Sequence, residues 1–227
     1  MGTYVITGAN RGIGLELTRQ LAAGGERVIG AVRRPDAAGE AEQAGARIEP
    51  CDVGDEASVR GLASRLEGEA VDVLINNAGV FPDKGKGLFD LDADAAADCL
   101  RINAVGPIIM TRALTPMLER GSRKLVVNIS STMGSLKRAE NGATGNYAYR
   151  ASKAALNMIT VLMASDLGKR GITCVAIHPG WVETDMGGKG ASLSPQESAR
   201  RLLETFEAIG AERSGSYLDT DGSTLPW

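Results

Sequence analysis

Tyr149 and Lys153 place a phenol and an ammonium group four residues apart in the segment Tyr-Arg-Ala-Ser-Lys. Residues at this spacing lie on one face of a helix. A free tyrosine titrates at about pH 10, and a neighbouring cation stabilises the phenolate and lowers that pKa. Such a phenol is a candidate general acid–base. The same spacing is common on ordinary amphipathic helices, so the pair indicates catalysis only if other motifs support it.

Seven short apolar runs, which alternate with longer amphipathic segments, would have to position this pair. The alternation is typical of an α/β protein with a parallel sheet and helices on both faces. No linker, repeat or low-complexity stretch divides the sequence, so we expect a single domain over residues 1–227. The predicted strands are residues 3–7, 27–32, 47–49, 71–75, 124–129, 173–177 and 215–218.

The composition argues against several classes of function. The net charge of −3, with no long run of one sign, is unlike that of a protein that binds nucleic acid or an anionic membrane. Cys51, Cys99 and Cys174 form no CxxC pair, so a disulfide framework is not expected and the cytoplasm is the expected compartment. A single histidine, His178, gives no basis for a zinc site or a Ser-His-Asp triad. No apolar run approaches the ~18 residues of a membrane-spanning helix.

The first predicted strand runs into a glycine-rich turn, Thr-Gly-Ala-Asn-Arg-Gly-Ile-Gly, at residues 7–14. Gly8, Gly12 and Gly14 let backbone N–H groups approach a pyrophosphate, and the N-terminus of the next helix adds a favourable field. The glycines are spaced more widely than in the commonest dinucleotide fingerprint. The turn therefore favours a dinucleotide site, with a purely structural turn as the alternative.

Two arginines, Arg33 and Arg34, follow the second predicted strand. An acidic residue here would accept hydrogen bonds from the adenosine ribose of NAD, whereas arginine suits the 2′-phosphate of NADP. Arg11, in the glycine turn, could reach the same phosphate. The pattern therefore favours NADPH over NAD, and the alternative is that both arginines are merely solvated.

Polar residues also follow the third and fourth predicted strands. Asp52 could accept a hydrogen bond from the adenine amino group, with Val53 packed on the ring, or it could be the N-cap of the next helix. Asn77, Ala78 and Gly79 stand at the carboxyl end of the fourth strand. Ligands of open α/β sheets bind at such strand ends.

Taken in order, these motifs resemble those of the short-chain dehydrogenase/reductase family, and the resemblance covers nearly the whole chain. The sequence is most similar to the carbonyl-reductase branch, which includes sniffer-type reductases and C-factor-like proteins. The matching motifs are Thr7-Gly-x-x-x-Gly12-Ile-Gly14, Asn76-Asn-Ala-Gly79, Asn103, Ile129-Ser-Ser131, Tyr149-x-x-x-Lys153 and Pro179-Gly180.

The resemblance implies a Rossmann fold with a doubly wound sheet, and it implies roles for individual residues. Tyr149 corresponds to the proton donor, and Lys153 to the residue that lowers its pKa and binds the nicotinamide ribose. Ser131, rather than Ser130, corresponds to the hydroxyl that holds the substrate oxygen. Asn103 corresponds to the helix-kinking residue that supports a water path to the lysine.

The resemblance also implies a cofactor site. Thr184 corresponds to the hydroxyl that binds the nicotinamide amide, with Val182 beside it. The complete predicted cofactor-binding set is Gly8, Asn10, Arg11, Gly12, Ile13, Gly14, Arg33, Arg34, Asp52, Val53, Asn77, Ala78, Gly79, Tyr149, Lys153, Pro179, Gly180, Val182 and Thr184. No metal is expected.

Two segments near the predicted site bear on which substrates could bind. Residues 136–146 form a longer connection than is usual in the family, and we interpret them as a loop at the substrate mouth or an ordinary surface turn. Residues 186–194 are glycine-rich and offer little apolar wall, which argues against a bulky steroid substrate. His178 is interpreted as structural, whereas Trp181 could line the pocket or pack in the core.

The function implied is NADPH-dependent reduction of a small aldehyde or ketone to the alcohol, with Tyr149 as proton donor. The alternatives are a dinucleotide-binding signalling protein of C-factor type with little turnover, and an oxidative alcohol dehydrogenase. By resemblance, residues 103–118 and 149–167 form the dimer face, so we expect a homodimer, with a tetramer as the alternative.

Overall fold

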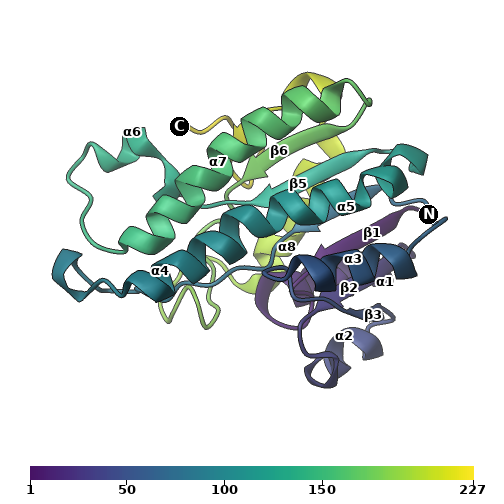
Figure 1. Cartoon of the computed structure of the whole chain (residues 1–227), viewed down its shortest axis with the longest axis horizontal. Coiled ribbons are helices and arrows are strands. Elements are labelled where there is room, and N and C mark those ends of the chain that lie inside the picture. The colour runs from purple at the N-terminus through teal and green to yellow at the C-terminus, as the bar shows by residue number, and fades with distance from the viewer.

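A seven-stranded parallel sheet forms the centre of the computed structural model, which describes all residues 1–227. The strand order is β3-β2-β1-β4-β5-β6-β7, and helices cover both faces (Figure 1). Each pair of neighbouring strands is parallel. The predicted α/β, single-domain Rossmann fold is confirmed.

The elements alternate between strand and helix along almost the whole chain. The strands are β1 (Thr3–Thr7), β2 (Arg27–Val32), β3 (Arg47–Pro50), β4 (Val73–Asn76), β5 (Leu125–Ile129), β6 (Thr173–Ile177) and β7 (Tyr217–Leu218). The α-helices are α1 (Gly12–Ala23), α2 (Gly39–Gln43), α3 (Glu56–Arg65), α4 (Ala93–Leu100), α5 (Gly106–Arg120), α6 (Leu136–Ala139), α7 (Tyr147–Gly168) and α8 (Pro195–Ala208). Short 3₁₀ turns lie at Pro35–Ala37, Leu88–Asp90, Thr132–Gly134 and Ala211–Arg213, and a π-helical turn lies at Arg101–Val105.

All seven predicted strands form, and their observed ends differ from the expectation by two residues at most. The last strand is shorter than its apolar run because Gly215 has a φ of +82°, which is outside the extended region. The third strand is one residue longer, since Pro50 stays in register with Val32 on β2. Pro50 can join because β3 is an edge strand, where a missing N–H leaves no ladder bond unmade.

The sheet separates two apolar cores. On one face, Ile6 of β1 and Val127 of β5 pack with Leu17 of α1 and Phe206 of α8. On the other face, α3, α5 and α7 cover the sheet, and Leu114 of α5 is fully buried there (Figure 1). Strands buried on both faces read as continuous apolar runs, which is why the sequence shows them so clearly.

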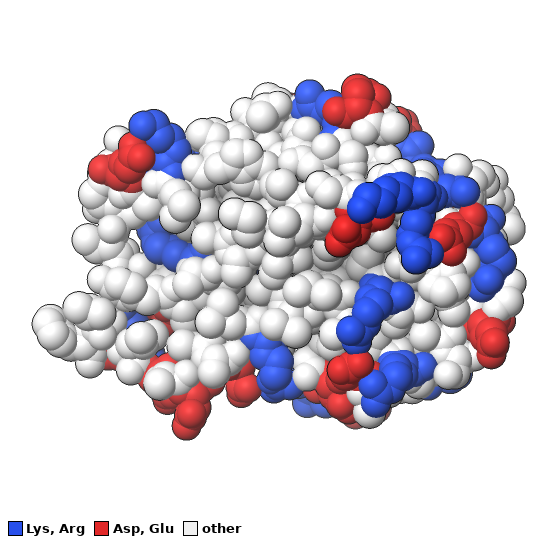
Figure 2. Space-filling model, turned by 45° about the horizontal axis from the view of Figure 1, so that its top comes forward, with Lys and Arg blue, Asp and Glu red and all other residues white.

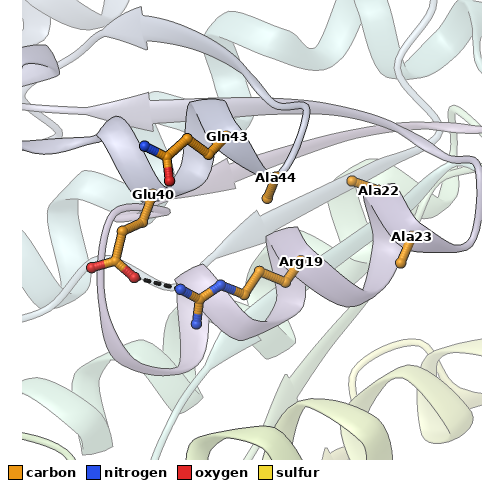
Figure 3. A pocket seen from close by; sticks show the side chains of 6 residues that line it. All are labelled: Arg19, Ala22, Ala23, Glu40, Gln43 and Ala44. Carbon is orange, nitrogen blue, oxygen red and sulfur yellow. Dashed lines mark hydrogen bonds and ion pairs between the residues drawn. The ribbon is translucent and has the colours of Figure 1, made fainter.

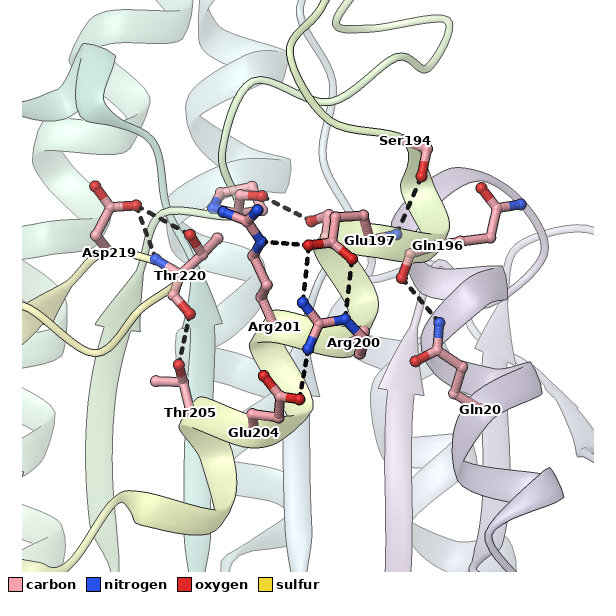
Figure 4. A network of polar contacts seen from close by, with 12 residues as sticks. Gln20, Ser194, Gln196, Glu197, Arg200, Arg201, Glu204, Thr205, Asp219 and Thr220 are labelled. Carbon is pink, nitrogen blue, oxygen red and sulfur yellow. Dashed lines mark hydrogen bonds and ion pairs between the residues drawn. The ribbon is translucent and has the colours of Figure 1, made fainter.

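Helix α8 is fixed by polar contacts on its outer surface, which Figure 4 shows. Glu197 accepts hydrogen bonds from Arg200 at 2.8 Å and from Arg201 at 2.7 Å. Gln20 of α1 donates to the backbone of α8, and Thr205 donates to the loop after β7 at 2.6 Å. The Gln20 contact joins α8 to α1, the Thr205 contact joins it to the loop after β7, and the Glu197 pairs lie within the helix. None of these residues belongs to the predicted site.

Four neighbouring strands of the sheet end at one edge, which we call the carboxyl edge. Strands β1, β4, β5 and β6 end there at Thr7, Asn76, Ile129 and Ile177. The connections reverse direction between β1 and β4, and such a switch point leaves a crevice for ligands in open α/β sheets. No helix of the chain has both the length and the hydrophobicity needed to cross a bilayer.

Candidate active site

Helix α7 carries the pair on which the site depends, and its start is held by a residue from another part of the chain. Asn146 precedes the helix in the left-handed region, with φ of +56°, and its side chain does not cap the helix. The buried carboxylate of Asp83 accepts hydrogen bonds from the backbone N–H groups of Ala148 at 2.7 Å and Tyr149 at 3.3 Å. Asp83 therefore serves as the N-terminal cap from a distance of 65 residues in sequence.

Tyr149 and Lys153 lie together on the buried face of α7, as predicted. Their side chains are 8% and 4% exposed. The Lys153 Nζ atom lies 5.7 Å from the centroid of the Tyr149 ring, close enough for a cation–π interaction. The ammonium group also donates to the carbonyl oxygen of Ile129 at the end of β5, at 2.7 Å. The lysine is therefore fixed between the aromatic ring and the carboxyl edge.

The direction of the Tyr149 pKa shift corrects the expectation from sequence. Burial raises the pKa of Tyr149 to about 12, and the hydroxyl of Ser131 opposes that rise. Burial also lowers the pKa of Lys153 to about 8. The predicted lowering of the Tyr149 pKa by Lys153 is wrong for the chain by itself, because desolvation of the phenolate dominates. Tyr149 therefore carries its proton at neutral pH.

Ser131 lies beside Tyr149, and Ser130 faces the other way. The Ser131 hydroxyl accepts from the backbone N–H of Met133 and lowers the pKa of Tyr149. The Ser130 hydroxyl donates instead to Asn157 at 2.6 Å. The structure thus brings the predicted hydroxyl, and not its neighbour, to the phenol.

Asn103 fixes the segment that follows β4. It lies in the π-helical turn Arg101–Val105, which interrupts the regular helix between α4 and α5 at the position where a kink is predicted. Its side chain accepts from the N–H of Val80 at 2.8 Å and donates to the carbonyl oxygen of Val80 at 2.9 Å. It also donates to Ser152 of α7 at 3.0 Å. Asn103 therefore connects the π-helical turn to α7 and to the strand end, and the water path remains a prediction.

The glycine turn presents unpaired N–H groups at the start of α1. The N–H groups of Gly12, Ile13 and Gly14 have no acceptor within the chain, as is usual in the first turn of a helix. Gly14 lies so close to Gly8 that a Cβ atom on Gly14 would overlap the Gly8 carbonyl oxygen. The amide of Asn77 donates to the carbonyl oxygen of Thr7 at 2.9 Å. The cradle is therefore held open toward an anion, as a pyrophosphate site requires.

The segment after β6 packs against this cradle. A Cβ atom on Gly12 would lie 3.2 Å from the methyl group of Thr184, although 172 residues separate the two in sequence. Arg11 pairs with Asp185 at 3.3 Å. The structure thus brings Thr184 to the predicted cofactor site, and it directs Arg11 to a carboxylate rather than leaving it unpaired.

Arg33 and Arg34 are exposed just beyond the end of β2, and neither forms an ion pair. The amide of Asn10 donates to the backbone carbonyl oxygen of Ala37 in the same region, at 3.5 Å. Two unpaired guanidinium groups beside the cradle fit a phosphate on the adenosine ribose. The residues present therefore suit NADP better than NAD.

Asp52 does not cap helix α3, so the structure removes one of its two interpretations. Asp55 is the cap, accepting from the N–H of Ala57 at 3.0 Å. Asp52 accepts instead from the N–H of Gly54 at 2.9 Å. Val53 is buried in the core behind it. The role of Asp52 and Val53 at an adenine ring stays a prediction.

The connection 136–146 is partly helical rather than a simple loop, because Ser135 caps the short helix α6 by accepting from the N–H of Arg138. His178 accepts from the backbone N–H of Thr132 at 3.3 Å, and burial lowers its pKa to about 4. It is therefore neutral and structural, as expected. Trp181 is 55% exposed and donates to the carbonyl oxygen of Gly187 at 3.1 Å, so it does not pack in the core.

Sequence reasoning missed three residues that touch the site. Phe81 stacks on the ring of Tyr149, with centroids 4.1 Å apart and ring planes at 17°. The second is Asp83, and the third is Tyr217, whose hydroxyl donates to the carbonyl oxygen of Ser131 at 2.6 Å. For Phe81 and Asp83, the only signal in the sequence is their position shortly after the fourth strand, where ligand-binding residues gather. No sequence signal identifies Tyr217.

The hollow between α1 and α2, which Figure 3 shows, lies away from this site. Arg19 of α1 meets Glu40 of α2 across it, and the other lining residues are Ala22, Ala23, Gln43 and Ala44. None of these residues belongs to the predicted site. No group of three or more His, Cys, Asp and Glu side chains is arranged to hold a metal ion.

Comparisons with known proteins agree with this geometry. Residues 3–192 match the family model described as short chain dehydrogenase. The C-signal protein of Myxococcus xanthus is 43% identical over 173 residues, which cover 74% of this chain and all of that protein. Among solved structures, the carbonyl reductase Sniffer of D. melanogaster is 31% identical with a TM-score of 0.93, covering all of both chains.

A second solved structure is the NADPH-bound carbonyl reductase from chicken fatty liver. It is 31% identical with a TM-score of 0.91, covering 99% of this chain and 98% of that one. The chain therefore belongs to the short-chain dehydrogenase family and is an NAD(P)-dependent short-chain oxidoreductase.

Proposed function

We propose that this short-chain dehydrogenase reduces a small aldehyde or ketone to the alcohol with NADPH, using Tyr149 as the proton donor. The observation that carries the proposal is the meeting of Tyr149, Ser131 and Lys153 at the carboxyl edge, next to an open anion cradle. The similarity to carbonyl reductases, one of them NADPH-bound, supports it.

The residues that would hold NADPH follow from the contacts within the chain. The free N–H groups of the glycine turn would bind the pyrophosphate, and Arg33 and Arg34 would bind the 2′-phosphate. Thr184 and Lys153 would bind the nicotinamide amide and ribose. When bound, the reduced nicotinamide supplies the hydride that a carbonyl carbon accepts.

The chain's own residues would manage the charge and the proton. Negative charge develops on the carbonyl oxygen as the carbon is reduced, and hydroxyl donors fixed in place beforehand stabilise that charge. Ser131 and Tyr149 are such donors, each less than a tenth exposed. The raised pKa of Tyr149 keeps the phenol protonated at neutral pH, which is the state that reduction requires.

The test compares wild type with Tyr149→Phe and Ser131→Ala, using NADPH and a panel of aldehydes and ketones. Loss of the proton donor should lower kcat by about 100-fold or more, while the affinity for NADPH, measured by fluorescence titration, stays within about threefold of wild type. Glu67→Gln, at an exposed position outside the proposed site and dimer face, serves as the control variant. Undiminished turnover in Tyr149→Phe would remove the phenol from its role.

The choice of NADPH is tested separately through the two arginines. The double variant Arg33→Ala, Arg34→Ala should lose NADPH affinity and keep NADH affinity, because only NADPH carries the 2′-phosphate. Native protein that binds NADH as tightly as NADPH would contradict this assignment.

The second candidate function is a dinucleotide-binding signalling protein with little turnover, which the 43% identity to C-signal favours. The complete set of Asn103, Ser131, Tyr149 and Lys153 argues for catalysis instead, because binding a dinucleotide does not need a buried proton donor. Tight NADPH binding without turnover across a broad carbonyl panel would support the signalling alternative.

We further propose a homodimer that uses the surface of α5 and α7, as in the family. Figure 2 shows few charged side chains over the middle of this face. Met158, Val161 and Leu162 of α7 and Val105 before α5 are 62%, 37%, 59% and 46% exposed. Leu162→Glu should therefore yield a monomer in light scattering. The three cysteines are free and buried, which is consistent with a cytoplasmic protein.

A further inference from the structure

The segment that follows β4 carries lysines over the entrance to the proposed active site. It begins at Phe81 against Tyr149 and continues through Asp83 at the start of α7. The next side chain, Lys84, crosses to the loop after Thr184 and donates to the carbonyl oxygen of Met186 at 3.0 Å. Lys84 thus connects the segment next to Tyr149 with the segment that carries Thr184, the predicted contact of the nicotinamide amide.

Three other basic residues belong to the segments that meet here, and we call these three and Lys84 the mouth cations. Lys86 accepts at its carbonyl oxygen from the N–H of Asn146, directly before α7. Arg150, one residue after Tyr149, donates to the carbonyl oxygen of Gly145 at 3.2 Å. Lys189 follows Gly188, whose added Cβ atom would lie 2.8 Å from the Lys84 ammonium.

None of the mouth cations forms an ion pair, although acidic side chains lie nearby. Asp83 is occupied by the two N–H groups of α7. Asp185 pairs with Arg11, and Glu140 pairs with Lys137 at 2.7 Å. The four mouth cations therefore have no ionic partner in the chain.

We propose that the substrate is a carbonyl compound that carries a carboxylate at the end remote from the carbonyl group. The inference rests on the proposed reductase function and deepens it by naming the substrate class. The carbonyl end would lie at Ser131 and Tyr149, the ring of Phe81 would contact the middle of the molecule, and Lys84 and Arg150 would bind the carboxylate. Arginine binds carboxylates through paired N–H donors, and lysine acts as a point charge.

The experiment compares two matched pairs of aldehydes with the NADPH-loaded protein. The first pair is 4-formylbenzoate and its methyl ester, and the second is the longer 4-(4-formylphenoxy)butanoate and its ethyl ester. The methyl ester of the first pair has the more electrophilic carbonyl group, so intrinsic reactivity would favour the ester. A preference for the acid must therefore come from the protein.

At low salt, wild type should turn over at least one acid with a kcat/KM about fivefold above that of its ester, as expected for a partly exposed ion pair. Lys84→Met and Arg150→Met should each reduce that ratio, and the double variant should bring it near one. Addition of 0.5 M NaCl, at which the screening length is roughly 4 Å, should also bring the ratio of wild type near one. Thermal melts check that each variant folds, and the acid-to-ester ratio cancels any change in rate that affects both substrates alike. Lys124→Met, which removes a charge at the opposite edge of the sheet, should leave the ratio as in wild type.

Ratios at or below one for both pairs in wild type, or ratios that neither variant changes, would overturn the inference and leave the reductase function intact. Absence of turnover for all four aldehydes, and for the broader carbonyl panel, would instead overturn the proposed function and the inference with it. The two failures are therefore distinguishable.

Discussion

Replacing Asp83 with alanine should destabilise the protein by about 3 kcal/mol, because this carboxylate caps the helix that carries Tyr149. Charge-assisted hydrogen bonds contribute roughly 1.5 to 3 kcal/mol each, and a buried donor without a partner costs about 1 to 3 kcal/mol. The bond to Ala148 is short at 2.7 Å, and the bond to Tyr149 is long at 3.3 Å, so we count one full contribution and one partial contribution. In a chain of this size, about 3 kcal/mol corresponds to a fall in Tm of roughly 9 °C.

Two further variants separate the burial of this cap from capping in general. Asp92 caps α4 by accepting from the N–H of Ala95 at 3.0 Å, but it is exposed. Asp92→Ala should therefore cost only about 1 kcal/mol. Asp83→Asn keeps one acceptor oxygen and should cost less than Asp83→Ala.

The assay is urea-induced unfolding followed by circular dichroism, together with NADPH-dependent turnover at a temperature where each variant is folded. Because Asp83 also positions the first turn of α7, Asp83→Ala should lower kcat by about tenfold, whereas Asp92→Ala should not change it. The reasoning would be refuted if Asp83→Ala cost no more stability than Asp92→Ala, or if it left kcat at the wild-type value.

Three other predictions follow from buried contacts. Gly14→Ala should lower both Tm and NADPH affinity, because the new methyl group overlaps the carbonyl oxygen of Gly8; thermal melts and titration check this, and unchanged affinity would contradict it. The pKa of Lys153 falls from 10.5 to about 8 on folding, so the unfolded chain binds more protons than the folded chain between these pH values. The stability of wild type relative to Lys153→Met should therefore rise with pH in that window by about 1 kcal/mol per pH unit. Urea unfolding of both proteins at pH 8 and pH 10 measures this difference. Tyr217→Phe should cost about 1 to 3 kcal/mol and lower kcat several-fold by freeing the backbone of Ser131; a variant with lowered stability but wild-type kcat would limit Tyr217 to a structural role.

Much of the fold could be predicted from sequence because its information is local. The strands are buried on both faces, so each appears as an unbroken apolar run. The positions of the glycine turn, Asn77 and the Tyr149–Lys153 pair followed from motifs in which a few neighbouring residues serve one task. These motifs could be placed at one edge of the sheet because the carboxyl ends of parallel strands meet there.

The contacts that could not be predicted join residues far apart in the chain. Asp83 reaches α7 over 65 residues, and Tyr217 reaches Ser131 over 86. Neither partner has a sequence pattern that identifies the other. The direction of the Tyr149 pKa shift was predicted wrongly for a related reason. The spacing of Tyr149 and Lys153 indicates a nearby cation, but it does not indicate that the phenol is buried.

The π-helical turn at Arg101–Val105 sets the rotation of α5 about the helix axis relative to α4, and so determines which residues of each helix face the core. A regular helix advances by about 100° per residue, and a π-helical turn accommodates one residue more than a regular turn. Deleting one residue from this turn would give a smoother helix, but it would rotate either Cys99 of α4 or Leu114 of α5 out of the core. Single-residue deletions should therefore be tolerated far worse here than point substitutions, and the chain cannot be shortened at this place by small steps.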